Sequence, residues 1–260
     1  MSSAEAVYAT EGPIAYLTFN RPQARNAMTW GMYEALARAC DQAESDPDVR
    51  VLVLRAAGEA FIAGTDIRQF TNFSTGEDGL AYEARMERVI GRLEALTIPT
   101  IAQVQGVAAG GGCVIALACD LRVCTPAARF GVPIARTLGN CLSAANCARI
   151  LDLIGPARTK DLLFTGRLID LREAESLGLV TRTVEPAAID GAVRELADQI
   201  ATHAPITIRV AKEAIRRIAS HRRLPAGQDD DLIAACYASE DFREGVAAFV
   251  AKRKPRFTGR

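Results

Sequence analysis

The stretch from Gln105 to Asp120 reads QGVAAGGGCVIALACD, and its three consecutive glycines are the strongest local signal in the sequence. An apolar, strand-like run over residues 99–104 precedes it, and an apolar helical pattern follows the glycines Gly110 to Gly112, so these glycines lie where a helix begins. The first turn of a helix has N–H groups without intrahelical partners, and glycine lets a ligand oxygen approach the backbone closely. The stretch therefore predicts an anion-binding helix start, although a plain tight turn against a packed helix has the same pattern.

A second glycine-containing turn follows an earlier predicted strand. Residues 50–56 read RVLVLRA, and residues 58–68 then run from an extended segment through Gly64 into the start of another helix. The backbone N–H of Thr65 is presented at this turn. Two N–H donors from separate loops are what an oxyanion hole needs to stabilise a thioester oxygen as it becomes an enolate or a tetrahedral oxyanion.

Together the two turns resemble the paired loops of the enoyl-CoA hydratase/isomerase (crotonase) superfamily. The motifs that carry the resemblance are Ala63-Gly-Thr-Asp-Ile67 and Gly106-Val-Ala-Ala-Gly-Gly-Gly-Cys113. Further motifs in order extend it over nearly the whole chain, at residues 20–27, 118–122, 164–167, 173–180 and 244–255. The resemblance implies an α/β fold, with a crotonase-type ββα spiral core that binds acyl-CoA over residues 1–200. It also implies a helical trimerisation region over residues 201–260, and hence a homotrimer or a dimer of trimers.

The repeated alternation of paired strands with a helix agrees with such a spiral. The expected secondary structure consists of a hairpin over residues 7–19 and helices over residues 29–43, 66–72, 80–96, 142–153, 157–164 and 172–177, followed by a strand over 179–184. Beyond Pro186 we expect only helices, over residues 187–202, 205–219, 226–239 and 241–253.

Composition excludes several classes of function. Lys plus Arg total 31 and Asp plus Glu total 31, so no net charge favours nucleic acid or an anionic membrane. The seven cysteines form no CxxC pair, and His203 and His221 are the only histidines, so no metal site is expected. The N-terminus has no basic segment followed by an apolar one, and no apolar run reaches transmembrane length, so we expect a cytoplasmic protein. No cofactor is expected other than coenzyme A as part of the substrate.

The resemblance also implies which residues form the site. The oxyanion hole would consist of the N–H groups of Thr65 and Gly111. The candidates for binding coenzyme A are Ala24, Arg25, Ala63, Asp66, Ile67 and Lys252. Arg25 and Lys252 also fit ordinary surface charges, and an aspartate that opens a helix, as Asp66 does, is expected chiefly to cap it.

The chain departs from the family where hydratases carry two glutamates, because Val114 and Ile134 stand at those positions. Hydration needs one group to activate water and one to deliver a proton, and neither side chain can do either. Asp120 is the only acidic residue between Glu94 and Asp152, and it is expected to be structural. If a carboxylate enters from elsewhere, Glu83 and Glu87 on the predicted 80–96 helix are the first candidates.

A second departure is the turn after Gly139, where hydratases are glycine-rich and this chain reads NCLSAAN over residues 140–146. Arg136, Asn140 and Ser143 are therefore candidate acyl-pocket residues together with Val114 and Ile134. Asn140 or Ser143 also suits the cap of a helix that begins near Leu142. Ser143 is a poor nucleophile because it lacks a GxSxG elbow.

Three classes of function remain open. The first is an enzyme that acts on a CoA thioester by chemistry other than two-glutamate hydration, such as decarboxylation of a substrate whose carboxylate Arg136 would hold, or a double-bond shift. The second is a homologue that binds acyl-CoA without turnover. The third is a scaffold that keeps only the oligomeric fold.

Overall fold

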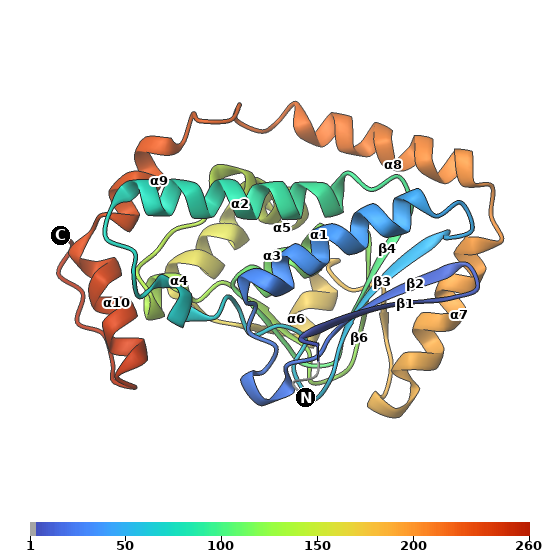
Figure 1. Ribbon diagram of the computed structural model, residues 1–260, viewed down its shortest axis with the longest axis horizontal. Helices are drawn as coiled ribbons and strands as arrows, with labels where there is room; N and C mark the ends of the chain where they lie inside the picture. The colour runs from blue at the N-terminus through green and yellow to red at the C-terminus, as the bar shows by residue number, and fades with distance from the viewer. Residues whose placement is uncertain (1–3) are drawn as a thin grey trace.

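The computed structural model describes residues 4–260 and has a mixed α/β architecture built on two sheets (Figure 1). In the larger sheet six strands lie in the order β1, β2, β3, β4, β6 and β9. β1 and β2 form an antiparallel hairpin, as predicted, and the later strands pair in parallel. The bounds of these strands are Ala6–Glu11, Ile14–Phe19, Val51–Ala56, Thr100–Val104, Leu121–Cys124 and Arg182–Thr183.

Alternate residues of the central strands face two separate hydrophobic cores. Leu52 and Leu54 of β3 pack on the side of α1 (Trp30–Ser45), whereas Val51 and Val53 pack on the side of α7 (Ile189–Ala201) (Figure 1). A strand that is buried on both faces reads as a nearly continuous apolar run, because successive side chains point to opposite faces. The run VLVL that opens β3 has this form and is buried throughout.

The smaller sheet positions the glycine stretch. Its strands are β5 (Val107–Ala109), β7 (Arg129–Gly131) and β8 (Ile169–Asp170), in that order. β5 leads directly into α3 (Gly111–Ala118), whose residues from Gly112 onward are all buried. The glycines thus lie at a strand-to-helix junction, as predicted.

Most predicted helices are present with shifted ends. α2 (Gly76–Glu94) begins earlier than predicted because Thr75 and Asp78 form a capping box. The two helices predicted on either side of residue 155 are the halves of α5 (Ala144–Thr165), which bends where Gly155 adopts a φ of +72° before Pro156. The remaining short helices before α7 are η1 (Pro22–Ala24), η2 (Ile67–Phe70), α4 (Ile134–Thr137), α6 (Leu171–Ser176) and η3 (Pro186–Ala188). α4 was not predicted.

The C-terminal helices α8 (Pro205–Ser220), α9 (Asp230–Tyr237) and α10 (Glu240–Val250) have different surroundings (Figure 1). α8 has no buried residue. α9 packs closely on α2, since a side chain at Gly79 would overlap the ring of Tyr237. α10 packs beside η2 through Phe242, whose ring lies 6.1 Å from that of Phe70.

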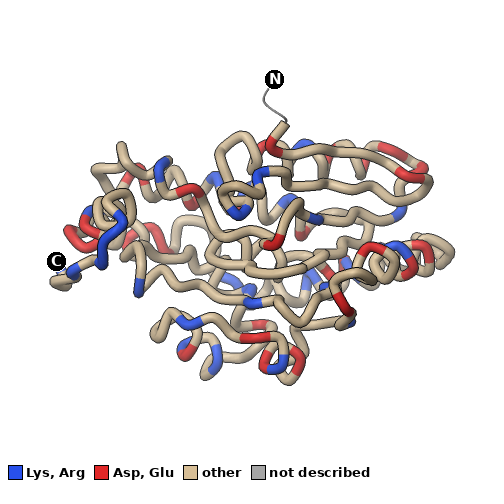
Figure 2. The backbone as a smooth tube through the Cα atoms, turned by 90° about the horizontal axis from the view of Figure 1, so that it is seen from below, with Lys and Arg blue, Asp and Glu red and all other residues tan. Residues whose placement is uncertain are grey.

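Charged residues of both signs are interspersed along the chain (Figure 2). Within residues 4–260, no helix is long and apolar enough to cross a membrane. In the same part of the chain, no three His, Cys, Asp or Glu side chains are grouped so that they could hold a metal ion.

Candidate active site

A cavity of about 440 Å³ lies where the two glycine loops meet α2, α4 and residues 138–146. Most of the predicted site residues line it. These are Ala24, Arg25, Ala63, Thr65, Asp66, Ile67, Gly111, Val114, Ile134 and Asn140. A largely apolar concave site with a few convergent polar groups is typical of a small-molecule pocket.

The two glycine loops lie directly against each other. Ile62 donates its N–H to Val107 O (3.1 Å) and accepts from the N–H of Ala109 (2.9 Å). Gly64 and Gly110 both have positive φ, +113° and +51°, a conformation that other residues rarely adopt. A Cβ atom on Gly110 would lie only 3.7 Å from Gly64 Cα, so the loops are in close contact at the cavity wall.

The N–H groups of Thr65 and Gly111 face no acceptor within residues 4–260. The neighbours of Thr65 are held by Met28, which donates its N–H to Gly64 O (2.8 Å) and accepts from the N–H of Asp66 (2.9 Å). Gly111 is the first residue of α3, where a helical N–H has no intrahelical partner. Both residues line the cavity, and neither N–H has a backbone partner in the described part of the chain.

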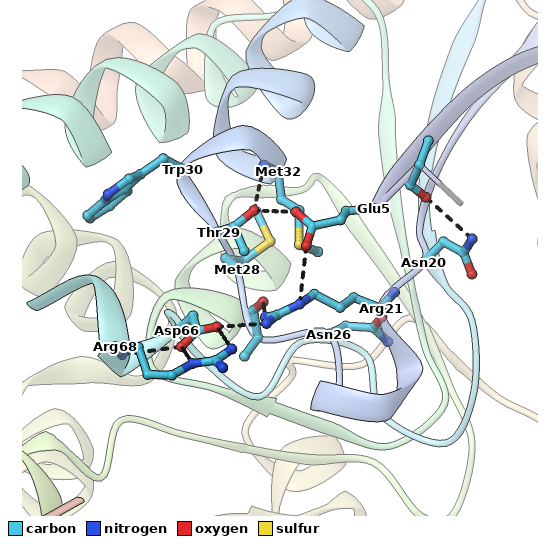
Figure 3. A network of polar contacts seen from close by, with 12 residues as sticks. Glu5, Asn20, Arg21, Asn26, Met28, Thr29, Trp30, Met32, Asp66 and Arg68 are labelled. Atoms are coloured by element: carbon cyan, nitrogen blue, oxygen red, sulfur yellow. Dashed lines mark hydrogen bonds and ion pairs between the residues drawn. The ribbon is translucent and has the colours of Figure 1, made fainter. Parts of the chain in front are cut away.

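A polar network centred on the buried side chains of Arg21, Asn26 and Asp66 supports the loop of Thr65 (Figure 3). Asn26 donates from Nδ2 to Ala57 O (2.8 Å) and to Ala60 O (2.9 Å), which joins the residue 20–27 segment to the chain ahead of the loop. Arg21 pairs with Asp66 at 2.8 Å and with Glu5 at 3.3 Å. The loop is thereby connected to the start of the chain and to the residues before α1.

Asp66 is the cap that the sequence predicts. Its side chain accepts the N–H of Arg68 (3.2 Å) at the start of η2, and it also forms ion pairs with the Arg68 and Arg21 guanidinium groups. Hydrogen bonding to Arg68, with a further contribution from Arg21, lowers the pKa of Asp66 to about 2. The carboxylate is therefore ionised and engaged, although it lines the cavity.

The hydroxyl groups of two tyrosines lie close to Thr65, and one of them also lies close to Gly111. Thr65 Oγ1 is 2.8 Å from the Tyr33 hydroxyl and 3.0 Å from the Tyr82 hydroxyl. A Cβ atom on Gly111 would lie 2.5 Å from the Tyr33 hydroxyl, so a larger residue at this position would require that hydroxyl to move. Burial raises the pKa of Tyr33 to about 12 and that of Tyr82 well above its usual value, so both phenols remain neutral.

Glu83 is the group that the predicted site set omits. It lies on α2, lines the cavity and is buried, with 4% of its surface exposed. Its Oε1 accepts the Tyr237 hydroxyl (2.9 Å), and its Oε2 accepts the Ser143 N–H (3.2 Å). Burial raises the pKa of Glu83 from 4.5 to about 7. Glu87, the other carboxylate considered from the sequence, instead forms a bidentate pair with Arg149 at 2.6 and 2.7 Å.

The turn after Gly139 places its two candidate residues differently. Asn140 lines the cavity and donates from Nδ2 to the Tyr237 hydroxyl (3.2 Å), and its buried Oδ1 has no partner in the described chain. Ser143 caps α5 by accepting the Asn146 N–H (3.4 Å), so it is the predicted cap and lies outside the cavity wall.

Arg136 and Lys252, like Ser143, do not line the cavity. Arg136 is exposed and does not line the cavity, because it lies two residues after Ile134 in α4 and thus about 200° around the helix axis. Lys252 is exposed beyond the end of α10, and Phe249 forms the cavity wall there instead. Asp120 is structural, as predicted, since it accepts the Thr100 N–H (2.7 Å) and pairs with Lys212 (2.6 Å).

Comparison with known proteins identifies the family. Residues 9–260 match the family described as enoyl-CoA hydratase/isomerase. The chain belongs to the enoyl-CoA hydratase/isomerase family. Among its relatives, a short-chain-enoyl-CoA hydratase of Clostridium acetobutylicum is 35% identical over 246 residues, which cover 94% of each chain. A crotonyl-CoA hydratase of Syntrophomonas wolfei is 32% identical, with 95% of each chain covered.

Solved structures of enoyl-CoA hydratase/isomerase relatives confirm the predicted fold class. An enoyl-CoA hydratase/carnithine racemase of Magnetospirillum magneticum matches with a TM-score of 0.80 at 35% identity, over 100% of this chain and 97% of that one. A methylmalonyl-CoA decarboxylase in complex with 2-nitronate-propionyl-CoA matches with a TM-score of 0.89 at 26% identity, over 100% of both chains. The protein is thus a crotonase-family acyl-CoA enzyme in its general class.

Proposed function

We propose that the protein is an enzyme that binds the thioester oxygen of an acyl-CoA between the N–H groups of Thr65 and Gly111 and stabilises the enolate formed from it. The observation that carries this proposal is the pair of N–H groups without acceptors at one cavity wall. Such preorganised donors act where negative charge develops in the transition state, and removing one typically costs about 10²- to 10³-fold in rate.

Coenzyme A would approach over the rim formed by Ala24, Arg25, Ala63 and Ile67, which line the cavity beside the Thr65 loop. The reaction would need no cofactor beyond the coenzyme A of the substrate. Standard hydration is not proposed, because the apolar Val114 and Ile134 line the cavity at the positions where hydratases carry their glutamates.

The N–H assignment is tested by a pair of variants that differ only at Gly111. A proline at that position removes the donor, and its Cβ needs the space that the Tyr33 hydroxyl occupies. The comparison is therefore between Tyr33→Phe and the double variant Tyr33→Phe/Gly111→Pro, with butyryl-CoA binding measured by calorimetry. We expect the double variant to bind butyryl-CoA at least tenfold more weakly. Equal binding in two folded variants would contradict the assignment.

Decarboxylation is the second candidate, and the structural match to a methylmalonyl-CoA decarboxylase favours it. Loss of CO₂ forms the enolate directly, so the oxyanion hole supplies most of the stabilisation. Malonyl-, methylmalonyl- and simple enoyl-CoAs assayed side by side distinguish decarboxylation from a double-bond shift. An acyl-CoA binder without catalysis would release no product from any of them.

Self-association into a trimer or a dimer of trimers is also proposed. α8 exposes Ile206, Val210, Ile215 and Ile218, each at 59% or more of its surface. Clustered apolar side chains of this kind mark interaction surfaces. Light scattering of the wild-type protein and of Ile215→Glu/Ile218→Glu measures the state, and we expect the variant to have the lower mass.

A further inference from the structure

The cavity wall contains six side chains that could in principle exchange a proton, and all but one are unsuitable. The six are Arg25, Asp66, Arg68, Tyr82, Glu83 and Cys141. Guanidinium groups stay protonated in proteins, and Asp66 is held as a carboxylate between Arg21 and Arg68. Burial raises the pKa of Tyr82, and a hydrogen bond to Cys236 together with burial raises that of Cys141. Only Glu83 can both gain and lose a proton near neutral pH.

On this basis we infer that Glu83 is the catalytic residue that takes a proton from, and returns it to, the carbon next to the thioester, with Tyr237 as its positioning residue. The inference rests on the proposed function, and it places the acid/base group on α2 in a chain whose α3 and α4 present Val114 and Ile134.

The hydrogen bonds of Glu83 leave it free to act as a base. Each carboxylate oxygen accepts one hydrogen bond, from Tyr237 or from Ser143, whereas a carboxylate offers about four lone-pair sites. The Tyr237 hydroxyl is itself held by Asn140 Nδ2 at 3.2 Å. The carboxyl group is therefore oriented from two sides while part of its acceptor capacity remains unused.

Within residues 4–260, no Lys or Arg side chain forms an ion pair with Glu83, whose hydrogen-bond partners are Tyr237 and Ser143. The titratable groups that interact electrostatically with Glu83 are all tyrosines, cysteines or an aspartate, and none carries a positive charge. They are Tyr33, Tyr82, Cys141, Cys147, Asp229, Cys236 and Tyr237. Arg149 of the neighbouring α5 is engaged by Glu87 and Glu94. A general base works best when its pKa lies near the working pH, and burial brings the pKa of Glu83 to about 7.

In the proposed step, the Glu83 carboxylate removes a proton from C2 of the acyl group. The C–H bond breaks, its electron pair forms the C1–C2 double bond of the enolate, and the enolate oxygen lies between the N–H groups of Thr65 and Gly111. Return of the proton to C2 restores the substrate, and its delivery to C4 of a 3-enoyl chain moves the double bond. The step needs no other reactant.

Proton exchange at C2 of an acyl-CoA tests the role of Glu83 without knowledge of the natural substrate. Butyryl-CoA is incubated with the protein in D₂O, and deuterium at C2 is followed by mass spectrometry. We expect exchange with the wild-type protein and a loss of about 10²- to 10⁴-fold in Glu83→Gln, which keeps the shape of the side chain. Glu77→Gln is the matched control, since Glu77 is exposed on the first turn of the same helix and should exchange like the wild type.

Butyryl-CoA binding, measured on the same samples, separates the two proposals. Exchange in Glu83→Gln at the wild-type rate, or no exchange in a wild-type protein that binds butyryl-CoA, would overturn the role of Glu83. Failure of the wild-type protein to bind any acyl-CoA would overturn the proposed function instead. Tyr237→Phe removes a hydrogen bond to the ionised carboxylate and should therefore raise the pKa of Glu83. In a plot of the C2 exchange rate against pH, the rise on the acidic side should then move to higher pH. An unchanged plot would contradict the positioning role of Tyr237.

Discussion

The Tyr237 hydroxyl on α9 donates a 2.9 Å hydrogen bond to Oε1 of Glu83 on α2, across 154 positions of the sequence. The buried carboxyl group in the cavity is thus held by a helix near the C-terminus. Burial disfavours its ionised form more than this hydrogen bond and that of Ser143 favour it, which raises the pKa of Glu83 to about 7. The consequences reach both stability and chemistry.

The pH dependence of stability should report this carboxyl group. Because its pKa is higher in the folded protein than in the unfolded chain, the folded state binds more protons between about pH 4.5 and 7, and stability falls as pH rises through that window. Glu83→Gln removes this loss, so above pH 7 it should be more stable than the wild type by about 3 kcal/mol, at about 1.4 kcal/mol per pH unit. Urea unfolding at pH 5 and pH 8 measures the difference. Parallel curves for the two proteins would show that the carboxyl is not charged at a cost in the folded state.

The close approach of Gly111 and Tyr33 leads to a second prediction about stability. Gly111→Ala keeps the N–H but places a Cβ 2.5 Å from the Tyr33 hydroxyl, and such overpacking typically costs about 1–3 kcal/mol. With Tyr33→Phe in the background, the nearest remaining atoms are Thr65 Oγ1 at 3.4 Å and the ring Cζ at 3.8 Å, which are ordinary contacts, so the cost of the alanine should largely disappear. A double-mutant cycle in urea measures this coupling. Strictly additive effects would mean that the hydroxyl does not limit the site.

Crotonyl-CoA hydration should be slow. Val114 and Ile134 supply no acid or base, and each such group is typically worth about 10²- to 10⁴-fold. We expect a hydration rate several orders of magnitude below that of a family member with both glutamates, measured by the loss of enoyl absorbance. A rate in the usual enzyme range of about 1 to 10³ per second would show that Glu83 or another group activates water.

The Asp66 ion pairs should stabilise the fold at neutral pH. The pKa of Asp66 is lowered from 3.8 to about 2, chiefly by its hydrogen bond to Arg68, so its contribution is present above pH 4 and lost as pH falls toward 2. Asp66→Asn should therefore cost about 1 kcal/mol at pH 7, because solvent screens the pairing with the exposed Arg68, and the difference from wild type should shrink toward pH 2. Thermal unfolding across this range tests it. A difference that does not depend on pH would point to lost hydrogen bonds rather than to lost charge.

Features with a local signature could be predicted from the sequence. Gly64 and Gly110 have positive φ, and glycines at such positions mark a turn that sequence alone reveals. Asp66 and Ser143 are helix caps, which depend only on the residues that directly follow them. The absence of carboxylates at positions 114 and 134 is equally visible in the sequence.

Features that depend on contacts between residues far apart in the sequence could not be predicted from it. Tyr33 repeats at helical spacing with Leu36 and Cys40, so the sequence marks it only as a core residue, and nothing local shows that its hydroxyl meets Thr65. The contact between Glu83 and Tyr237 likewise depends on how α9 packs on α2. The exposed position of Arg136 could not be predicted for a smaller reason, since a single helical turn at Ile134–Thr137 is too short to leave a periodic pattern.

Most of the contacts that hold the two halves of the cavity wall come from separate parts of the chain, and the contact between Thr65 Oγ1 and the Tyr82 hydroxyl (3.0 Å) joins them. The N–H groups of Thr65 and Gly111 are positioned by residues 21–29 and by the smaller sheet, whereas Glu83 is held by residues 140–143 and by α9. With the roles proposed for these groups, evolution or an engineer could replace the side of the cavity that contains Glu83 while most supports of the two N–H groups stay in place. Such an arrangement would let one scaffold acquire new reactions on CoA esters by changes at a few positions outside the glycine loops.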